Sequence, residues 1–464
     1  GDTIFLNSRY AEYNGNEEVA YATGNVTLNS PQSNLVTDTI FFNRKIQQAF
    51  YNSNGTITNK DNILKSKSGR YYLNEKKYSF KTAVTVTNPR STIKTNHLDY
   101  YDNSGHAYVF GPSTISSKND YIYTENGFYD TTNDIGKLKK NSYIVYNSRK
   151  IEGDDIYYDR KKNFSRAENN VKITDTINDL IATGHYAEVY RNTLTKNDSM
   201  FITKKALVVT LVEKDSMYMH GKKIMVTGPT EDRIIRAFNN VRFFKTDMSG
   251  KCDSLYSNNK TALTKLIGKP VIWSTNGQMT GDIMHLIGNN STEKLDSLKV
   301  LNNAFLIQKD TLSEDGYNQI KGQNLYGKFR DNKLYEVDII KNCESIYYIY
   351  TKENEFVGID KKVCSAFNLQ FKNEEITQFK AIKSVKSETL PDDELPPNAR
   401  KLRGFIWRGE EQIKSKNDIF PAEELAIDAN VQKEKTKKNA EENVPMAILK
   451  ETINFDKNNP KKKE

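Results

Sequence analysis

The sequence predicts an elongated, repetitive, all-β protein, and three observations support this. The 464-residue chain is only 37% hydrophobic, yet it contains 27 tyrosines and 21 phenylalanines. A short motif recurs about every thirty residues along most of the chain. Most segments alternate apolar and polar side chains, the period-two pattern of strands with one buried face. This composition favours a thin β architecture that keeps much of the chain near water.

The recurring motif is a small or polar residue, two variable positions and an apolar residue, often followed by tyrosine. It reads Gly-Asp-Asp-Ile-Tyr-Tyr at Gly153–Tyr158 and Gly-Gln-Asn-Leu-Tyr at Gly322–Tyr326. The apolar anchors lie at positions 40, 71, 98, 128, 156, 187, 224, 255, 284, 325 and 367. Successive anchors are 27 to 42 residues apart, with the widest gaps at the end. Such spacing is typical of an array whose units pack on their neighbours.

A second motif falls between these anchors. It reads Gly-Asn-Val-Thr-Leu at Gly24–Leu28, Asn-Asn-Val-Lys-Ile at Asn169–Ile173 and Asn-Asn-Val-Arg-Phe at Asn239–Phe243. Asn and Gly suit joints at which the backbone takes a positive φ, while the β-branched and aromatic residues that follow favour strands. Each unit is therefore expected to supply about two strands. No segment before Ile376 keeps the spacing of an amphipathic helix.

Stacked units of this kind enclose a core along one axis, either as a closed solenoid or as an open half-pipe with a lengthwise apolar groove. The inward positions mix side chains of unequal size, which favours the half-pipe. The candidate groove-facing, lipid-binding residues are Val26, Leu28, Ile40, Phe42, Val84, Val86, Leu98, Tyr100, Ile156, Tyr158, Val171 and Ile173. The alternative interpretation is that these side chains form a dry core and contact no ligand.

The spacing and the proline distribution divide the chain into three parts. Residues 1–190 are expected to form a first array and residues 191–380 a second one with longer insertions. Five of the eleven prolines precede residue 381 and six follow it, so residues 381–464 are expected to be a linker and a charged tail, disordered or partly helical near Glu423–Val431. Within this part, Gly404–Arg408 is expected to fold back onto the arrays.

The charge and the apolar runs exclude several classes of protein. The net charge of +9 is spread along the body, and only Lys461–Lys463 forms a block, so no nucleic-acid site is indicated and an anionic glycolipid or membrane surface fits as well or better. No apolar run is long enough for a transmembrane helix. The chain begins without a signal-peptide pattern, so it is either cytoplasmic or a mature form.

No residue pattern indicates catalysis, a metal site or a cofactor. Cys252, Cys343 and Cys364 lack metal-ligand spacing. Cys343 and Cys364 could pair on neighbouring strands, although three half-buried thiols are the simpler interpretation. Asp154 and Asp155 precede a strand, where acidic residues of a turn are expected rather than a catalytic pair.

The two strand motifs, with the segment Leu402–Glu410, resemble those of OstA-like proteins, which are related to LptA and to the N-terminal domain of LptD. The resemblance covers roughly Thr3 to Glu410. It implies a β-jellyroll, or β-taco, that holds the acyl chains of lipopolysaccharide in its groove and has no catalytic residues. It also implies a mature periplasmic protein, associated with components of the inner or outer membrane.

The same resemblance implies partners. Lipopolysaccharide would pass from an inner-membrane export complex to an outer-membrane LptD-like translocon, and both would join the array by strand addition at its edges. Head-to-tail self-association follows from the same edges. Two alternatives remain at this point: a closed β-solenoid that binds or cleaves polysaccharide, and a structural scaffold.

Overall fold

The computed structural model describes residues 5–30, 33–59, 61–118, 120–192, 194–195, 197–212, 215–274, 277–292, 294–313, 315–372, 375–391 and 394–426. The chain forms two compact units, Gly1–Ile419 and Phe420–Glu464. In the second unit, residues 422–426 are helical. The rest of the helix expected near Glu423–Val431 lies outside the described residues, as does Lys461–Lys463.

The strands of the first unit belong to one sheet. At its N-terminal end they are β1 (Phe5–Asn7), β2 (Tyr10–Asn14), β3 (Val19–Asn29), β4 (Asn34–Asn43), β5 (Gln48–Tyr51), β6 (Gly55–Asn59), β7 (Asn62–Ser66), β8 (Ser68–Tyr72) and β9 (Lys77–Thr87). In the middle they are β10 (Ser91–Tyr101), β11 (His106–Ser117), β12 (Asp120–Asp130), β13 (Ile135–Tyr146), β14 (Arg149–Asp159), β15 (Phe164–Asp175), β16 (Leu180–Tyr190), β17 (Ser199–Val212), β18 (Asp215–Thr227), β19 (Ile234–Lys245) and β20 (Met248–Asn258).

At the C-terminal end the strands are β21 (Leu263–Ile267), β22 (Val271–Trp273), β23 (Gly277–Thr280), β24 (Ile283–Gly288), β25 (Leu295–Lys309), β26 (Tyr317–Arg330), β27 (Lys333–Tyr350), β28 (Phe356–Lys372), β29 (Glu375–Ile382) and β30 (Lys386–Leu390). The short 3-10 helices among the described residues include η1 (Thr230–Asp232), η3 (Pro397–Arg400), η4 (Gly409–Glu411) and η5 (Lys416–Ile419).

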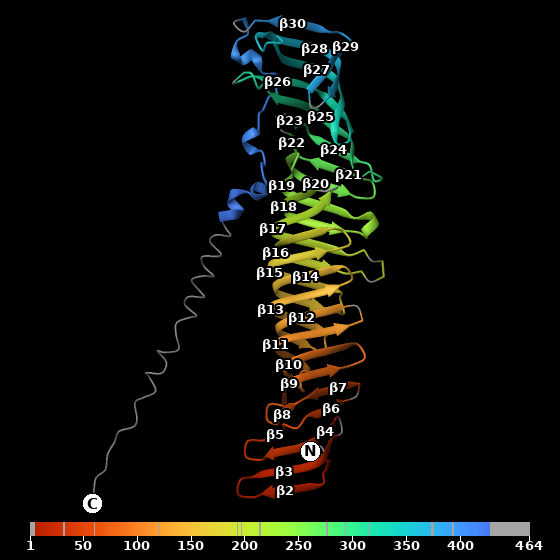
Figure 1. Cartoon of the computed structure of the whole chain (residues 1–464), viewed down its shortest axis with the longest axis vertical. Coiled ribbons are helices and arrows are strands. Elements are labelled where there is room, and N and C mark those ends of the chain that lie inside the picture. Colours follow the sequence, from red (N-terminus) through yellow and green to blue (C-terminus); the bar gives the residue numbers. More distant parts are fainter. Residues whose placement is uncertain are drawn as a thin grey trace, which may run out of the picture. The chain divides into compact units, whose positions relative to one another are not determined.

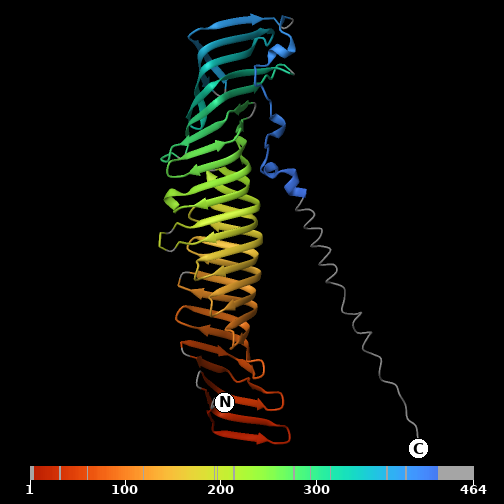
Figure 2. The ribbon, with the colours of Figure 1, turned by 180° about the vertical axis from the view of Figure 1, so that it is seen from behind.

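The first unit is an elongated antiparallel stack. From β9 to β20, each strand pairs antiparallel with the next strand in the sequence. Figures 1 and 2 show the strands following one another along a single axis, from red β2 to blue β30. The predicted fold class, an elongated all-β array, is therefore confirmed.

Each long strand is bent, so that its two halves lie in two different walls. In β13 and β14, residues 135–139 pair with 155–159, whereas 142–146 pair with 149–153, and the register shifts between Lys139 and Ser142. Wall A consists of residues 142–146 and of all strand halves linked to them through successive strand pairing. Wall B consists of residues 135–139 and of the strand halves linked to those in the same way. At β20 the two walls take separate strands, since β21 continues wall B and β22 continues wall A.

The bends line up as a crease along which the walls join. Alternate strands cross it through two consecutive residues with positive φ: 24–25, 82–83, 140–141, 169–170, 204–205, 239–240, 268–269, 302–303, 341–342 and 383–384. Asn adopts this conformation more readily than most residues, because its short polar side chain can hydrogen-bond locally. The Asn-Asn motif thus marks the crease within one bent strand, whereas the sequence suggested a joint between two strands.

The first motif marks the same crease on the neighbouring strands. A Cβ at Gly322 would lie 2.5 Å from the Cγ2 atom of Ile339, and one at Gly281 would lie 2.3 Å from the Cγ1 atom of Val300. Only glycine leaves room there for the inward side chain of the next strand. Both repeats therefore arise because every long strand has to cross one line.

The core lies between the walls. Inward side chains from Phe80 to Leu369 form one continuous cluster, in which Ile156 has no exposed surface. A smaller cluster at the N-terminal end contains Ala22, Val26 and Ile40. Whether the array divides near residue 190 remains a prediction.

A segment after the last strand runs back along wall A. We call residues 394–419 the return segment. Leu395 and Leu402 pack on the outward side chains Phe305, Ile307 and Ile346 in a third cluster. The side chain of Gln319 donates to the carbonyl oxygen of Arg400 at 2.8 Å and accepts from the amide of Leu402 at 2.9 Å. The expectation that Gly404–Arg408 folds back is confirmed, since Phe405 and Trp407 pack against this cluster.

Candidate functional site

The groove between the walls is the candidate site. Its predicted residues come from both walls, and eleven of the twelve belong to, or pack against, the two inner clusters: Val26, Leu28, Ile40, Val84, Val86, Leu98, Tyr100, Ile156, Tyr158, Val171 and Ile173. Phe42 alternates with Ile40 along β4 and so lies on the same face. All twelve therefore face the interior, but lipid contact by these residues remains a proposal.

The interior is tightly filled in the middle of the array. Ile156, Val171 and Ile173 are at most 2% exposed. Near the N-terminal end, Leu28 and Phe42 are only half-buried. The enclosed cavity between β14 and β18 has a volume of about 20 Å³, which is too small for an acyl chain. A lipid tail would therefore enter by separating the walls or from the looser end.

The edge opposite the crease, which we call the mouth, is where the hairpin ends of the two walls meet. Arg90, at a hairpin of wall A, lies 3.8 Å from Asp134, at a hairpin of wall B, measured from Nη1 to Oδ2. Farther along, Arg233 of wall B contacts Asn178 of wall A. The walls are thus joined covalently at the crease, whereas these contacts across the mouth are made by side chains.

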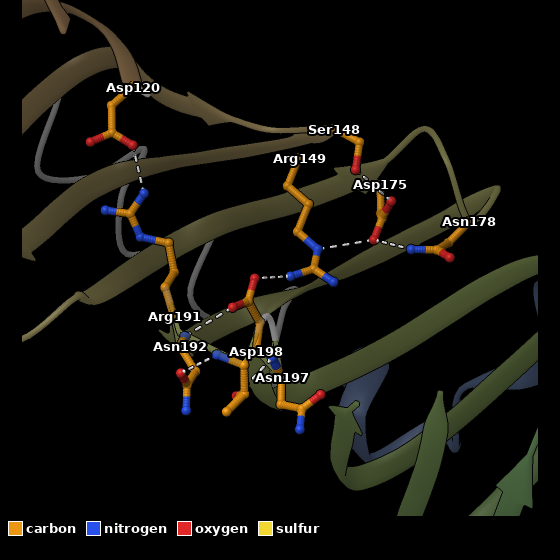
Figure 3. A network of polar contacts seen from close by, with 10 residues as sticks. Asp120, Ser148, Arg149, Asp175, Asn178, Arg191, Asn192, Asn197 and Asp198 are labelled. Carbon is orange, nitrogen blue, oxygen red and sulfur yellow. Dashed lines mark hydrogen bonds and ion pairs between the residues drawn. The ribbon is translucent and has the colours of Figure 1, made fainter. Parts of the chain in front are cut away.

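The most extensive mouth contacts lie around the connection between β16 and β17, and Figure 3 shows them. Arg191, directly after β16 in wall B, donates from Nη1 to Oδ1 of Asp120 in wall A at 2.5 Å. Arg149, at the start of β14 in wall A, donates from Nε to Oδ2 of Asp175 at 2.9 Å and also contacts Asp198, directly before β17. The contacts of Arg191 with Asp120 and of Arg149 with Asp198 close the mouth above the small cavity.

Burial sets the ionisation of this network. Burial opposes ionisation of Asp175, but hydrogen bonds from Asn178 and Arg149 outweigh it and hold the pKa of this carboxyl below its usual range. Burial lowers the pKa of the Arg233 guanidinium and raises the pKa of the Tyr158 hydroxyl. The Asp175 carboxyl therefore stays ionised near neutral pH, while the Tyr158 hydroxyl stays protonated.

Sequence reasoning missed the mouth residues. Each is a single charged residue at a hairpin, and Asp120 and Arg191 are 71 positions apart. The only signal in the sequence would have been an Arg and an Asp at hairpins that face each other from the two walls. Recognising such a pair requires knowledge of the register of every strand between them.

The other candidates have structural roles. Asp154 accepts a hydrogen bond from Asn170 at 2.8 Å, and Asp155 lies 3.8 Å from Lys139, so both acids support the crease. Cys343 and Cys364 lie opposite each other on β27 and β28, and both thiols are free.

The described residues show neither a metal-ligand cluster nor a membrane-spanning helix. Within the described ranges, no group of three or more His, Cys, Asp or Glu side chains could hold a metal ion. None of the described helices is long and apolar enough to cross a membrane.

Comparison with known proteins identified a matching family model and matching solved structures. A family model described as OstA-like protein matches residues 1–96. Among solved structures, LptH of Pseudomonas aeruginosa, described as the LptA-homologous periplasmic component of the lipopolysaccharide transport device, matches with 12% identity and a TM-score of 0.22, covering 23% of this chain and 82% of LptH. No curated protein sequence matches this chain. The family match confirms the resemblance to OstA-like proteins over residues 1–96.

Proposed function

We propose that this chain is a non-enzymatic periplasmic lipid-transport protein that holds the acyl chains of lipopolysaccharide between walls A and B. In this proposal it passes the lipid from the inner to the outer membrane. The observation that carries the proposal is the continuous apolar interior from Phe80 to Leu369, between walls joined covalently along one edge only. The OstA-like match over residues 1–96 supports it.

The energetics of such a groove are favourable. Burying a methylene group gains about 0.8 kcal/mol relative to water, so an acyl chain of about ten methylenes gains about 8 kcal/mol before ordering costs. When the walls part, their inward side chains exchange contact with each other for contact with the lipid, so little apolar surface meets water. The main costs are backbone bending at the crease and loss of the mouth ion pairs.

The alternative of a closed solenoid has less support. The two walls are continuous through the backbone at the crease, but the mouth contacts named above, such as Arg191 with Asp120, are made by side chains. Such an edge can open without breaking a backbone ladder. A half-pipe therefore accounts for the geometry better.

Partners are proposed to add strands at the two ends of the array. At one end, β1 and β2 pair only with β3 among the described strands. At the other end, β29 and β30 pair only with β28 among them. The inner-membrane export complex, an outer-membrane LptD-like translocon and a second copy of this chain are the proposed partners, since unpaired strand edges accept a further strand.

Photocrosslinking tests the groove with matched neighbours. A benzophenone amino acid replaces Phe42, which is half-buried and inward, or Phe41, which stacks outward on Phe50 at 5.1 Å between ring centroids. We expect crosslinks to lipopolysaccharide from position 42 and not from position 41. Lipids extracted from the purified protein are identified by mass spectrometry. Equal crosslinking at both positions, or no acylated lipid in the extract, would contradict the proposal.

A further inference from the structure

The mouth edge of β16 and β17 carries three different surfaces at one place. Val189 and Met200 face inward and line the small enclosed cavity. Tyr190 and Ser199, their neighbours in sequence, face outward and line a shallow depression of about 510 Å³ on wall B. Between the two faces, at the rim, lie Arg191 and the carboxylate of Asp198.

The inner surface is apolar. The cavity is lined by Ile173, Leu180 and Val226 in addition to Val189 and Met200, and Arg149, Asp175 and Asp198 form its polar side. Apolar side chains below a charged rim suit the junction of an amphiphile, where a hydrocarbon tail meets its head group.

The rim carries two partly buried guanidinium groups. The side chains of Arg149 and Arg191 are 22% and 16% exposed. The Nε–H of Arg191 is buried and has no hydrogen-bond partner. A buried donor without a hydrogen-bond partner is costly. An oxyanion placed here would accept the hydrogen bond that no protein group accepts. Guanidinium groups match the geometry of phosphate, which carries about −1.5 to −2 charges at neutral pH as a monoester.

The outer surface has the composition of a saccharide platform. Tyr186, Tyr190 and Phe201 supply aromatic rings, while Ser199, Thr203 and Glu188 supply polar groups. The Glu188 carboxylate accepts from the hydroxyls of Tyr186, at 2.5 Å, and Tyr190, at 3.0 Å, which fixes its position. The Lys223 ammonium lies 4.9 Å from the centre of the Phe201 ring and adds a positive charge. Rings beside fixed acceptors can contact the C–H face and the hydroxyls of a sugar together.

We propose that this edge binds the head group of a phosphorylated glycolipid, with the phosphate on Arg149 and Arg191, the sugar in the outer depression and the tails toward the inner cavity. The inference rests on the proposed function and adds the position of the head group. The phosphate takes the place of the Asp198 carboxylate as partner of Arg149 and of the Asp120 carboxylate as partner of Arg191. Two contacts between the walls are thereby released. Head-group binding and opening of the mouth are therefore one event.

The test measures binding of three probes to the full chain: bisphosphorylated lipid A, the same lipid after enzymatic removal of both phosphates, and inorganic phosphate. Arg149→Gln with Arg191→Gln should weaken binding of the phosphorylated lipid at least tenfold. Binding of the dephosphorylated lipid should not weaken, because the same change removes two ion pairs that hold the walls together. Arg166→Gln is the matched control, since that arginine lies outward on β15 over Tyr157. Asp198→Asn should tighten binding of the phosphorylated lipid, whereas a purely structural role of Asp198 would weaken it.

A second arm tests the sugar platform. Phe201→Ser should weaken binding of lipid A several-fold and leave phosphatidic acid unaffected, while Tyr157→Ser, outside the depression, should change neither. Circular dichroism of each variant confirms that the array is folded.

Each outcome is decisive. Equal wild-type affinity for phosphorylated and dephosphorylated lipid would overturn the phosphate site and leave the proposed function standing. Binding of neither lipid would overturn the proposed function itself. If inorganic phosphate alone displaces the lipid completely at millimolar concentration, the site is one for free anions and the head-group assignment is wrong.

Discussion

The crease at Thr82 and Ala83 provides a direct test of how the array bends. Both residues have positive φ, 65° and 52°, and both side chains are exposed. A β-branched residue and alanine are poor choices here, because the left-handed conformation costs about 1–2 kcal/mol for an ordinary L-residue. Asn239 and Asn240 occupy the equivalent place in β19, with φ values of 63° and 55°.

We therefore expect Thr82→Asn with Ala83→Asn to stabilise the array locally. Asn lowers but does not abolish the conformational cost, so the expected gain is about 1–2 kcal/mol for the pair. No packing is lost, since neither side chain is buried, and the amide of Ala83 can still donate to Oδ1 of Asn96, now 3.3 Å away. The gain should arise almost entirely from the backbone.

Hydrogen exchange is the appropriate assay, because an array unfolds in parts and a single melting temperature averages over them. A gain of 1–2 kcal/mol slows exchange of the protected amides in β9 and β10 about 5- to 30-fold. The reverse change, Asn239→Thr with Asn240→Ala, should speed exchange in β19 and β20 by a similar factor. If the first variant exchanges at the wild-type rate or faster while the reverse variant behaves as expected, backbone strain at residues 82–83 is not what limits stability there.

Three further predictions follow from burial and charge. Ile156→Ala should cost about 2–5 kcal/mol of unfolding free energy in urea titrations, because the side chain is fully buried, while Tyr157→Ala on the opposite face should cost clearly less. Gln319→Ala leaves two backbone groups of the return segment unsatisfied and should expose residues 394–419 to protease, whereas Gln308→Ala, at an exposed position of β25, should not. The pKa of the Asp175 carboxyl is lowered, so this group stabilises the folded state fully above about pH 3.9, the unfolded value. That stabilisation is lost as the pH falls through the folded pKa. Asp175→Asn should therefore remove this part of the acid dependence in thermal melts.

Much of the fold was predictable because the crease imposes a local rule. Each long strand has to cross the same line, so residues such as Asn169, Asn170 and Gly322 recur at intervals of roughly thirty residues and can be recognised without knowing any distant contact. The inward positions follow from period-two alternation on either side, which is why Ile156 and Val171 were placed correctly. That a strand passes through the Asn-Asn joint, instead of ending there, depends on pairing with both neighbours and is not a local property.

The mouth and the return segment depend on longer-range geometry. Arg191 reaches Asp120 only because five bent strands, β12 to β16, and the turns between them bring the two side chains together. From the sequence, Gln319 is an ordinary polar residue of a strand. Its role depends on residues 394–419, which lie over it in the folded chain. Neither contact produces a repeated motif in the sequence, because each is made at one place in the array.

The tight core and the proposed lipid conduit are compatible if opening is controlled at the rim. Ile156 and Ile173 contact apolar neighbours whether the walls touch each other or a hydrocarbon chain, so the core contributes little net resistance to separation. The ion pairs of Arg191 with Asp120 and of Arg149 with Asp198 are different, because parting the walls leaves partly buried charges without partners. Resistance is thus concentrated at a few points along the mouth, and a ligand that supplies its own anion there removes it. The point of lipid entry would then be set by where the arginines lie, and the apolar interior would determine only how far along the array the tails can travel.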